Sequence, residues 1–294
     1  MAEYILENEK LKVTLRTKSA ELISIIKKET GTEYLWNGDS RYWGWTSPVL
    51  FPFVGGLRDK KYSYQGKTYE MNQHGFARNQ EFELLGRTEK EIRFVLESTE
   101  ETKKQYPFDF RLEIGYVLED SHIQVCWKVK NTGSGPLWFS IGAHPAFMCP
   151  IDGRGKQTDY YMGFETDKKE LTYRLIDLES NLISPVEYPL ALEEGLHQVE
   201  KDRFDRDALV IEHGQTKKMW LAGPDKKPYV SVEFDAPLFG VWSPAKKNAP
   251  FICIEPWYGR SDSTEFYGTL EEREYINCEE PNGVFERSYG ITVL

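Results

Sequence analysis

Two of the five histidines lie in segments that could bring an imidazole to a binding site. His144 lies in IGAHPAF, residues 141–147, where small neighbours leave room around the ring and the following proline fixes the turn. His74 lies in QHGFARN, residues 73–79, where Gly75 lets the backbone pass close to another group. In the same segment, Arg78 could bind an anion or a hydroxyl group.

Glu255 is the most unusual carboxylate of the chain. It follows the apolar run FICI and precedes PWYG, so the sequence predicts a buried or half-buried side chain. A buried carboxylate is costly unless it is paired or hydrogen-bonded. Beside aromatic residues its pKa should rise, which suits a general acid or base.

Weaker candidates surround these three residues. Asp207 stands just before a predicted strand, and Arg58 in GLRD could join Arg78 in binding an anion. Trp43 and Trp257 offer aromatic faces of the kind that stack on the C–H surface of a sugar.

Each of these residues also has a purely structural interpretation. The two histidines could be buried and bonded to backbone carbonyls, and Glu255 could anchor a loop through backbone N–H groups. The two arginines could form salt bridges that shape their loops, Asp207 could be a turn residue, and most tryptophans could belong to the core. The local sequence alone does not choose between these interpretations.

The sequence predicts that the elements that position these side chains are β-strands. Aromatic and β-branched residues occur in short alternating runs. In one run Ile123, Val125, Trp127 and Val129 alternate with polar residues, which predicts one buried face and one wet face. Hairpins are expected at 20–36 and at 82–97, a three-stranded meander at 110–141, and further strands at 208–212, 219–222, 229–234 and 251–255.

Helical patterns are scarce. The best helix candidate covers 167–179, and no βαβ alternation or glycine-rich phosphate loop is present, which excludes Rossmann and P-loop folds. With no internal repeat and no low-complexity linker, we expect an all-β protein, a single large antiparallel β-sandwich spanning 1–294.

Composition narrows the classes of function. The chain has 294 residues, 37 Lys and Arg against 47 Asp and Glu, and a net charge of −10. Nucleic acids and anionic membranes are therefore not expected partners. The charged N-terminus predicts no secretory signal, and four widely spaced cysteines predict free thiols, so we expect a cytoplasmic protein that is a monomer or a homodimer.

Four segments in order resemble the aldose 1-epimerase (galactose mutarotase-like) superfamily, specifically its LacX-type branch. They are FPFVG at 51–55, QHGFARN at 73–79, GAHPAF at 142–147 and IEPWYG at 254–259. The resemblance covers nearly the whole chain and implies a β-supersandwich with a sugar pocket on a concave face.

The resemblance also implies roles for individual residues. His144 would protonate the ring oxygen of a pyranose, Glu255 would remove the proton of the anomeric hydroxyl, and His74 and Asp207 would bind the sugar. Such a mutarotase needs no metal or other cofactor. The segment QHGFARN departs from typical galactose mutarotases and looks like the hexose-6-phosphate epimerase and LacX-type branches. In the hexose-6-phosphate epimerases, arginines near the pocket hold the sugar phosphate, and Arg78 matches that pattern by position.

The leading hypothesis is therefore a mutarotase that interconverts the α and β anomers of a free or phosphorylated hexose. A non-catalytic sugar-binding or regulatory module with the same pocket is the main alternative. Glycoside hydrolysis is a third, because Asp207 and Glu255 could supply the two carboxylates it requires.

Overall fold

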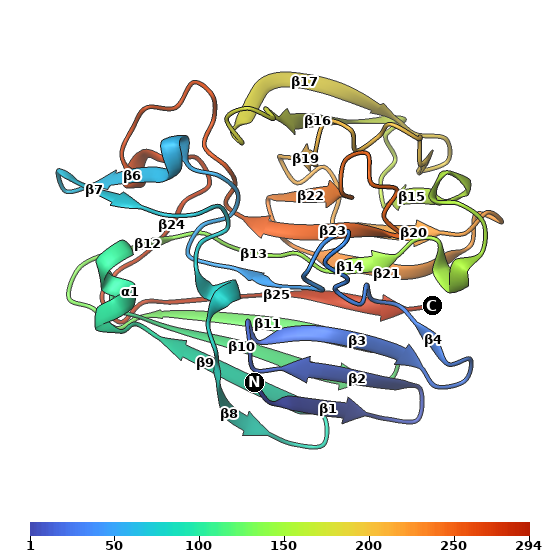
Figure 1. Ribbon diagram of the computed structural model, residues 1–294, viewed down its shortest axis with the longest axis horizontal. Coiled ribbons are helices and arrows are strands. Elements are labelled where there is room, and N and C mark those ends of the chain that lie inside the picture. The colour runs from blue at the N-terminus through green and yellow to red at the C-terminus, as the bar shows by residue number, and fades with distance from the viewer.

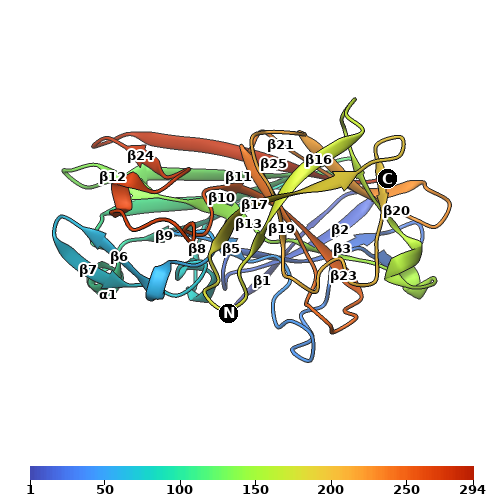
Figure 2. The same ribbon diagram turned by 90° about the horizontal axis from the view of Figure 1, so that it is seen from above.

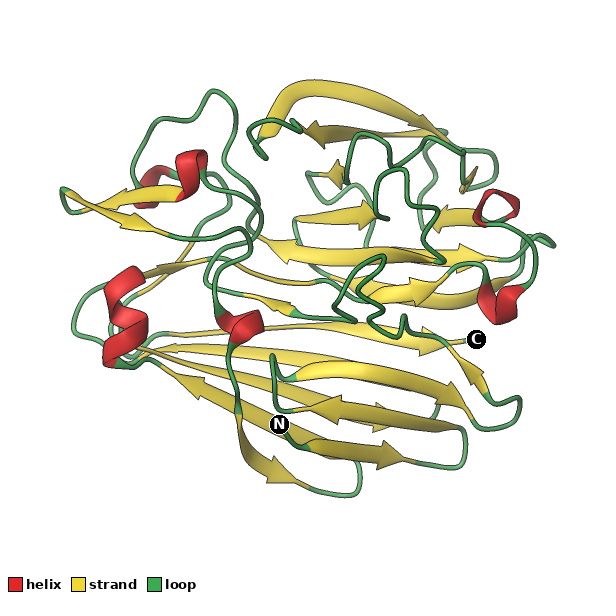
Figure 3. Cartoon of the chain, viewed as in Figure 1, coloured by secondary structure: helices red, strands yellow, loops and turns green.

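The computed structural model describes residues 1–294 and is built almost entirely of antiparallel strands, with few helical turns (Figure 3). Alternating sequence patterns produce its longest strands. In β11 (His122–Asn131) every second residue from Ile123 onward is buried, and β11 pairs over its full length with β10 (Phe110–Glu119). The alternation at 122–131 therefore produces the two-faced strand that the sequence predicts.

The largest sheet has nine strands and forms one layer of the molecule (Figures 1 and 2). Its strands, in spatial order, are β18 (Leu196–Gln198), β15 (Tyr161–Phe164), β20 (Lys218–Ala222), β21 (Pro228–Phe234), β25 (Val284–Val293), β11, β10, β9 (Glu91–Glu97) and β8 (Glu83–Arg87).

The second large sheet carries the candidate site. Its strands, in order, are β17 (Ile183–Ala191), β16 (Glu170–Ile176), β19 (Leu209–Ile211), β22 (Leu238–Trp242), β23 (Phe251–Tyr258), β13 (Ile141–Ala143) and β5 (Val49–Leu50), and β14 (Ala146–Met148) also pairs with β23. The two sheets meet through aromatic side chains: Phe239 lies 5.0 Å from Phe234, and Tyr258 lies 6.3 Å from Trp127 between ring centroids.

A four-stranded sheet covers one end of the nine-stranded sheet (Figure 1). It contains β1 (Glu3–Glu7), β2 (Leu11–Arg16), β3 (Glu21–Lys27) and β4 (Thr32–Glu33). Tyr4 packs edge-on against Phe94, and the Tyr116 hydroxyl donates to the carbonyl of Ala20. The main hydrophobic core extends through these sheets, from Leu6 to Val293.

Two further pairs of short strands and several short helical turns complete the chain. The pairs are β6 (Lys61–Tyr64) with β7 (Lys67–Glu70), and β12 (Leu137–Phe139) with β24 (Asn277–Glu279). The helical elements are α1 (Glu100–Gln105), η1 (Arg58–Lys60), η2 (Ala77–Asn79), η3 (Ile151–Gly153), η4 (Gln157–Asp159) and η5 (Leu270–Glu272). No helix has the length and apolar character needed to cross a membrane.

The all-β fold and both expected hairpins are confirmed, while two local predictions are wrong. Residues 170–176, inside the expected helix, form strand β16, because every second residue there is buried against the core. The meander also stops after two strands: β12 pairs with β24, and the free edge of β11 is taken by β25. The Asn131 side chain helps to turn the chain out of the sheet, since it donates to the carbonyls of Gly135 and Glu279.

Candidate active site

The site is built on β23, a strand that is buried on both faces. Ile252, Ile254 and Tyr258 face the main core. Because side chains alternate along a strand, Cys253, Glu255 and Trp257 point to the opposite face. Glu255 is only 1% exposed, so the sequence-based expectation of a buried carboxyl at this position is confirmed.

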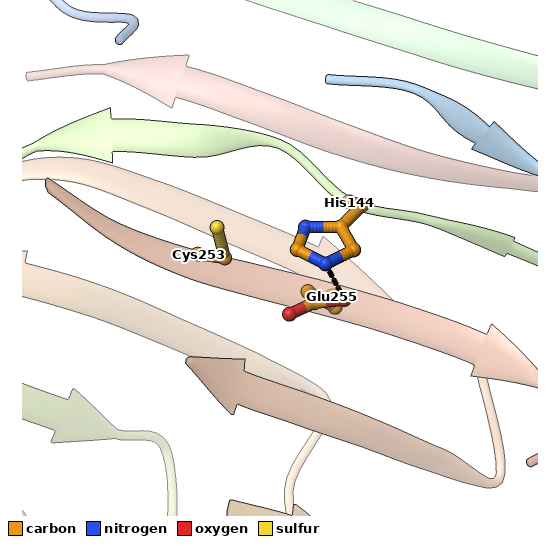
Figure 4. Close-up of side chains that lie close together, drawn as sticks. All are labelled: His144, Cys253 and Glu255. Atoms are coloured by element: carbon orange, nitrogen blue, oxygen red, sulfur yellow. Dashed lines mark ion pairs between the residues drawn. The ribbon is translucent and has the colours of Figure 1, made fainter. Parts of the chain in front are cut away.

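His144 lies between β13 and β14, two short strands that pair with β23 at residues 257–258 and 251–253, on either side of Glu255. Its Nε2 is 3.2 Å from Oε2 of Glu255 (Figure 4). Neither His144 Nδ1 nor Glu255 Oε2 has a well-aligned hydrogen-bond partner, although both atoms are buried. The two side chains thus form a close acid–base pair whose hydrogen-bonding capacity is largely unused.

Burial shifts the two pKa values in opposite directions. It lowers the pKa of His144 from 6.5 to about 3, and the positive charge of Arg78 adds to this effect. The pKa of Glu255 is raised well above its ordinary value, first by burial and second by the nearby charge of Asp207. Both shifts favour the neutral form of each group, in which the carboxyl group of Glu255 carries a labile proton.

Glycines make room for an indole beside the pair. Gly142 in β13 lies opposite Trp257, and Gly240 in β22 lies opposite Glu255. A Cβ atom at Gly142 would lie 2.6 Å from the Trp257 ring, and one at Gly240 would lie 2.5 Å from it. The ring of Trp257 therefore lies flat across two glycines, and its Nε1 donates to the carbonyl of Ala143.

Two further tryptophans cover the imidazole. The ring of Trp43 stacks on His144 at 4.5 Å between centroids, and Trp242 meets the imidazole edge-on at 5.4 Å. Trp43 is half-buried and belongs to the loop between β4 and β5. Because part of its ring is exposed next to His144, Trp43 could serve as a platform for a ligand.

His74 approaches the pair from a second loop. Its ring lies 5.7 Å from that of His144, nearly perpendicular to it. The backbone N–H of Gly55 donates to His74 Nδ1 at 3.1 Å, so in the neutral ring the proton is on Nε2. Burial lowers the pKa of His74 well below its ordinary value. His74 is therefore a neutral hydrogen-bond donor.

The loop that carries His74 is fixed by close backbone contact with the segment 51–55. Gly75 has φ of 69°, and a Cβ atom there would lie 2.3 Å from the carbonyl oxygen of Phe51. The N–H of His74 also donates to the carbonyl of Gly55. Two of the segments that carry the family resemblance thus bind each other, and the other two meet where β13 pairs with β23.

Arg78 is a cation without a carboxylate partner. Its guanidinium donates to the carbonyl of Gln73, its Nε is buried and unpartnered, and it lies 5.7 Å from the Trp45 ring. Its charge lowers the pKa of both His74 and His144, which puts the guanidinium near both rings. The ammonium group of Lys18 also lies over the Trp45 ring, 5.6 Å from the ring centroid.

The remaining candidates differ in their surroundings. Asp207 is half-buried, its pKa is raised by burial, and its charge affects Glu255, so it lies beside the pair. Arg58 instead donates to the carbonyls of Ser263, Thr264 and Phe266. It holds together two loops, which is the structural role that the sequence left open for it.

Sequence reasoning did not single out several residues that surround the pair. Trp242 carries no local signal that distinguishes it from a core tryptophan, and Gly55 acts through its backbone. Cys253 shares the face of Glu255, and the alternation of residues along 251–258 could have placed it there. Its sulfur, one nitrogen of His144 and one oxygen of Glu255 all lie within 4.8 Å of one another, a set that could hold a metal ion. A cavity of about 970 Å³ lies elsewhere, around Gln157 and His197.

Comparison with known proteins agrees with this architecture. The model of the aldose 1-epimerase family matches residues 3–266. The chromosomally encoded protein LacX of Lactococcus lactis subsp. lactis is 31% identical, over 98% of each chain.

Solved structures extend the likeness to the whole fold. A galactose mutarotase related enzyme from Lactobacillus acidophilus has 32% identity and a TM-score of 0.94, covering 100% of this chain and 97% of that one. A galactose mutarotase-like protein from Lactobacillus casei has 26% identity and a TM-score of 0.92, with both chains covered completely. This chain therefore belongs to the aldose 1-epimerase family.

Proposed function

We propose that the protein interconverts the α and β anomers of a hexose by acid–base opening of the sugar ring at His144 and Glu255. The observation that carries this proposal is the buried pair itself, with Nε2 and Oε2 3.2 Å apart. Burial lowers the pKa of His144 and raises that of Glu255, which suits the exchange of a proton with a ligand. A pyranose presents its ring oxygen O5 and its anomeric hydroxyl O1 on the same carbon. Two groups this close can address both oxygens at once.

Ring opening requires one proton to leave O1 and another to arrive at O5. With its proton on His144, the pair donates to O5 from the imidazolium while the Glu255 carboxylate accepts the proton of O1. Rotation about the C1–C2 bond then exposes the other face of the carbonyl, and the reverse transfers close the ring. No net charge enters or leaves the site, since the pair gives one proton and takes one. Each positioned proton transfer contributes roughly 10²–10⁴-fold to the rate.

The neighbouring side chains support the binding of a sugar. Trp43 offers an aromatic face at the outer side of His144, where the C–H surface of a pyranose can stack. His74, protonated on Nε2, can donate to a sugar oxygen. Asp207 lies on the Glu255 side and can accept from a hydroxyl.

The proposed substrate carries an anionic group, of which a phosphate on the hexose is the simplest case. A guanidinium with a buried, unpartnered Nε, such as that of Arg78, lacks the counter-charge that would normally accompany it. Lys18 on the same Trp45 ring adds a second cation. Together they could bind a phosphate while the sugar ring contacts His144 and Glu255 at the side of Trp43.

Anomer exchange can be measured directly by two-dimensional exchange NMR on glucose, galactose and their 6-phosphates. We expect wild type to accelerate exchange, and His144→Ala and Glu255→Gln each to lower kcat at least about 10²-fold. His213→Ala, which changes an exposed histidine, is the matched control and should keep the full rate. Binding of the sugar without faster exchange would favour the binding-module alternative, and release of reducing ends from a disaccharide would favour hydrolysis.

Arg78→Gln tests the anionic part of the proposal. We expect it to raise KM for the 6-phosphates at least about tenfold, the scale of one lost charge-assisted hydrogen bond, and to leave exchange of the free sugars within about twofold. An equal loss on both kinds of substrate would mean that Arg78 shapes its loop and does not bind a phosphate.

A further inference from the structure

We propose that Cys253, His144 and Glu255 form a binding site for a thiophilic divalent cation such as Zn²⁺ or Cd²⁺, and that the cation inhibits the protein by occupying the acid–base pair. The cation is an inhibitor in this proposal and not a cofactor. Metal binding stands on the geometry alone, whereas inhibition rests on the proposed function.

The geometry supplies three protein ligands on one face of the sheet. Their donor atoms lie within 4.8 Å of one another (Figure 4). A tetrahedral zinc ion with bonds of about 2.0–2.3 Å needs ligand atoms roughly 3.5 Å apart. Since His144 Nε2 and Glu255 Oε2 are already 3.2 Å apart, side-chain movements of about 1 Å or less suffice.

The donor atoms have few competing partners. Glu255 Oε2 is buried without an aligned hydrogen bond, with His144 Nε2 3.2 Å away, and both side chains are more than nine-tenths buried. All four cysteines are unpaired, so the thiol of Cys253 is available as a ligand. A third ligand beside an unsatisfied pair is what distinguishes this cluster from an ordinary His–Glu contact.

The donor types select the cation. Thiolate, imidazole and carboxylate together suit Zn²⁺ and Cd²⁺, and three protein ligands leave a position open for water or a sugar oxygen. Mg²⁺ and Ca²⁺ prefer oxygen ligands in larger numbers, which this cluster cannot supply. We therefore expect Zn²⁺ to compete with the sugar, and Mg²⁺ at the same concentration to have no effect.

Cadmium titration tests the site without any assay of activity. The starting protein carries Cys126→Ser and Cys278→Ser, which remove the two cysteines that are not fully buried. Added Cd²⁺ should produce the ultraviolet charge-transfer band of a cadmium–thiolate bond and saturate at one equivalent. The band should disappear in Cys253→Ala and in Cys253→Ser, the second of which keeps nearly the original volume.

Cys149→Ala is the matched control, because Cys149 is also fully buried but lies beside Tyr229 and Tyr160. This variant should keep the band. Absence of the band in the starting protein, or its persistence in folded Cys253→Ala, would overturn the proposal.

Inhibition is measured on the same variants. Zn²⁺ should raise the apparent KM of the sugar in wild type, and Cys253→Ala should keep the basal exchange rate while becoming at least about tenfold less sensitive to Zn²⁺. Equal sensitivity of the two proteins would place the inhibitory cation elsewhere. If no sugar is exchanged at all, the proposed function fails, while the cadmium titration still decides whether the site exists.

Discussion

The replacement Glu255→Gln should make the protein more stable while removing its activity, and the gain should grow with pH. The Glu255 carboxyl is 1% exposed and its pKa is raised well above 4.5 by burial. In the unfolded chain the same carboxyl ionises at its ordinary pKa. Between these two values the folded protein binds one proton more than the unfolded chain does, so the free energy of unfolding falls as pH rises.

The size of the effect follows from that one proton. Each pH unit above 4.5 costs wild type about 1.4 kcal/mol until the pH reaches the folded pKa of Glu255, whereas glutamine does not titrate. Between pH 5 and pH 7 the variant should gain about 2.7 kcal/mol relative to wild type if that pKa lies above 7. For a chain of 294 residues this corresponds to a relative rise in Tm of about 4 °C.

Urea unfolding followed by tryptophan fluorescence from pH 5 to pH 8 measures the difference directly, and the pH at which it levels off gives the folded pKa of Glu255. His144 titrates in both proteins, so its contribution largely cancels. Glu212→Gln is the control: Glu212 is 4% exposed, but it pairs with Arg174 and Arg260, and its replacement should destabilise the protein at every pH. A stability difference for Glu255→Gln that stays constant with pH would refute the reasoning, because it would mean that Glu255 is ionised in the folded protein.

Three further outcomes follow from the same geometry. The acid limb of the pH profile of kcat/KM should lie well below pH 6.5, because burial lowers the pKa of His144 to about 3; an acid limb near 6.5 would contradict this. In urea unfolding, Gly75→Ala should lose more stability than Gly66→Ala. Both glycines have positive φ, but only at Gly75 would the new Cβ atom meet backbone, the carbonyl oxygen of Phe51 at 2.3 Å. Equal losses would mean that this contact relaxes freely. His74→Asn keeps an acceptor for the backbone N–H of Gly55 and tolerates the local φ of 68°. The Tm should therefore change little, while KM for the sugar should rise several-fold. An unchanged KM would mean that His74 does not bind the sugar.

The sequence predicted the fold where the pattern of burial is local. The alternation at 122–131 and the turn residues at 29–32 produced the expected strands at the expected positions. The failures concern partners that are distant in sequence. Nothing between 110 and 141 indicates that β25, from the end of the chain, will occupy the edge of β11, and the alternation in 170–176 is short enough to resemble one face of a helix. The helix α1 was also missed, because six residues with a Thr99 cap give little periodicity to detect.

Part of the candidate site could also be predicted from the sequence, because some of its signals are local. Glu255 could be singled out because a carboxylate next to an apolar run is expected to be buried, which is costly without a partner. Gly75 and Pro145 indicated the loops that carry His74 and His144. Distances between these segments depend on sheet order, which the sequence did not contain. Arg58 and Arg78 illustrate the limit, since both stand beside glycine-rich turns, yet loop carbonyls satisfy the guanidinium of Arg58 and leave Arg78 with a buried Nε that has no partner.

The neutral state of the pair reconciles its burial with its chemistry. A buried ion pair would have to repay the desolvation of two charges with one contact, which such pairs often fail to do. Burial instead opposes the charge on each partner and favours an uncharged imidazole at His144 and a carboxylic acid at Glu255. Transfer of one proton across the 3.2 Å contact creates both charges together, and only a ligand with a proton to give and a lone pair to receive one can use them. Adjacent oxygens on the anomeric carbon meet that requirement, and water can meet it too. Exclusion of water is therefore as important to the proposed reaction as the pair itself, and the Trp43 ring, which stacks on His144, can contribute to it.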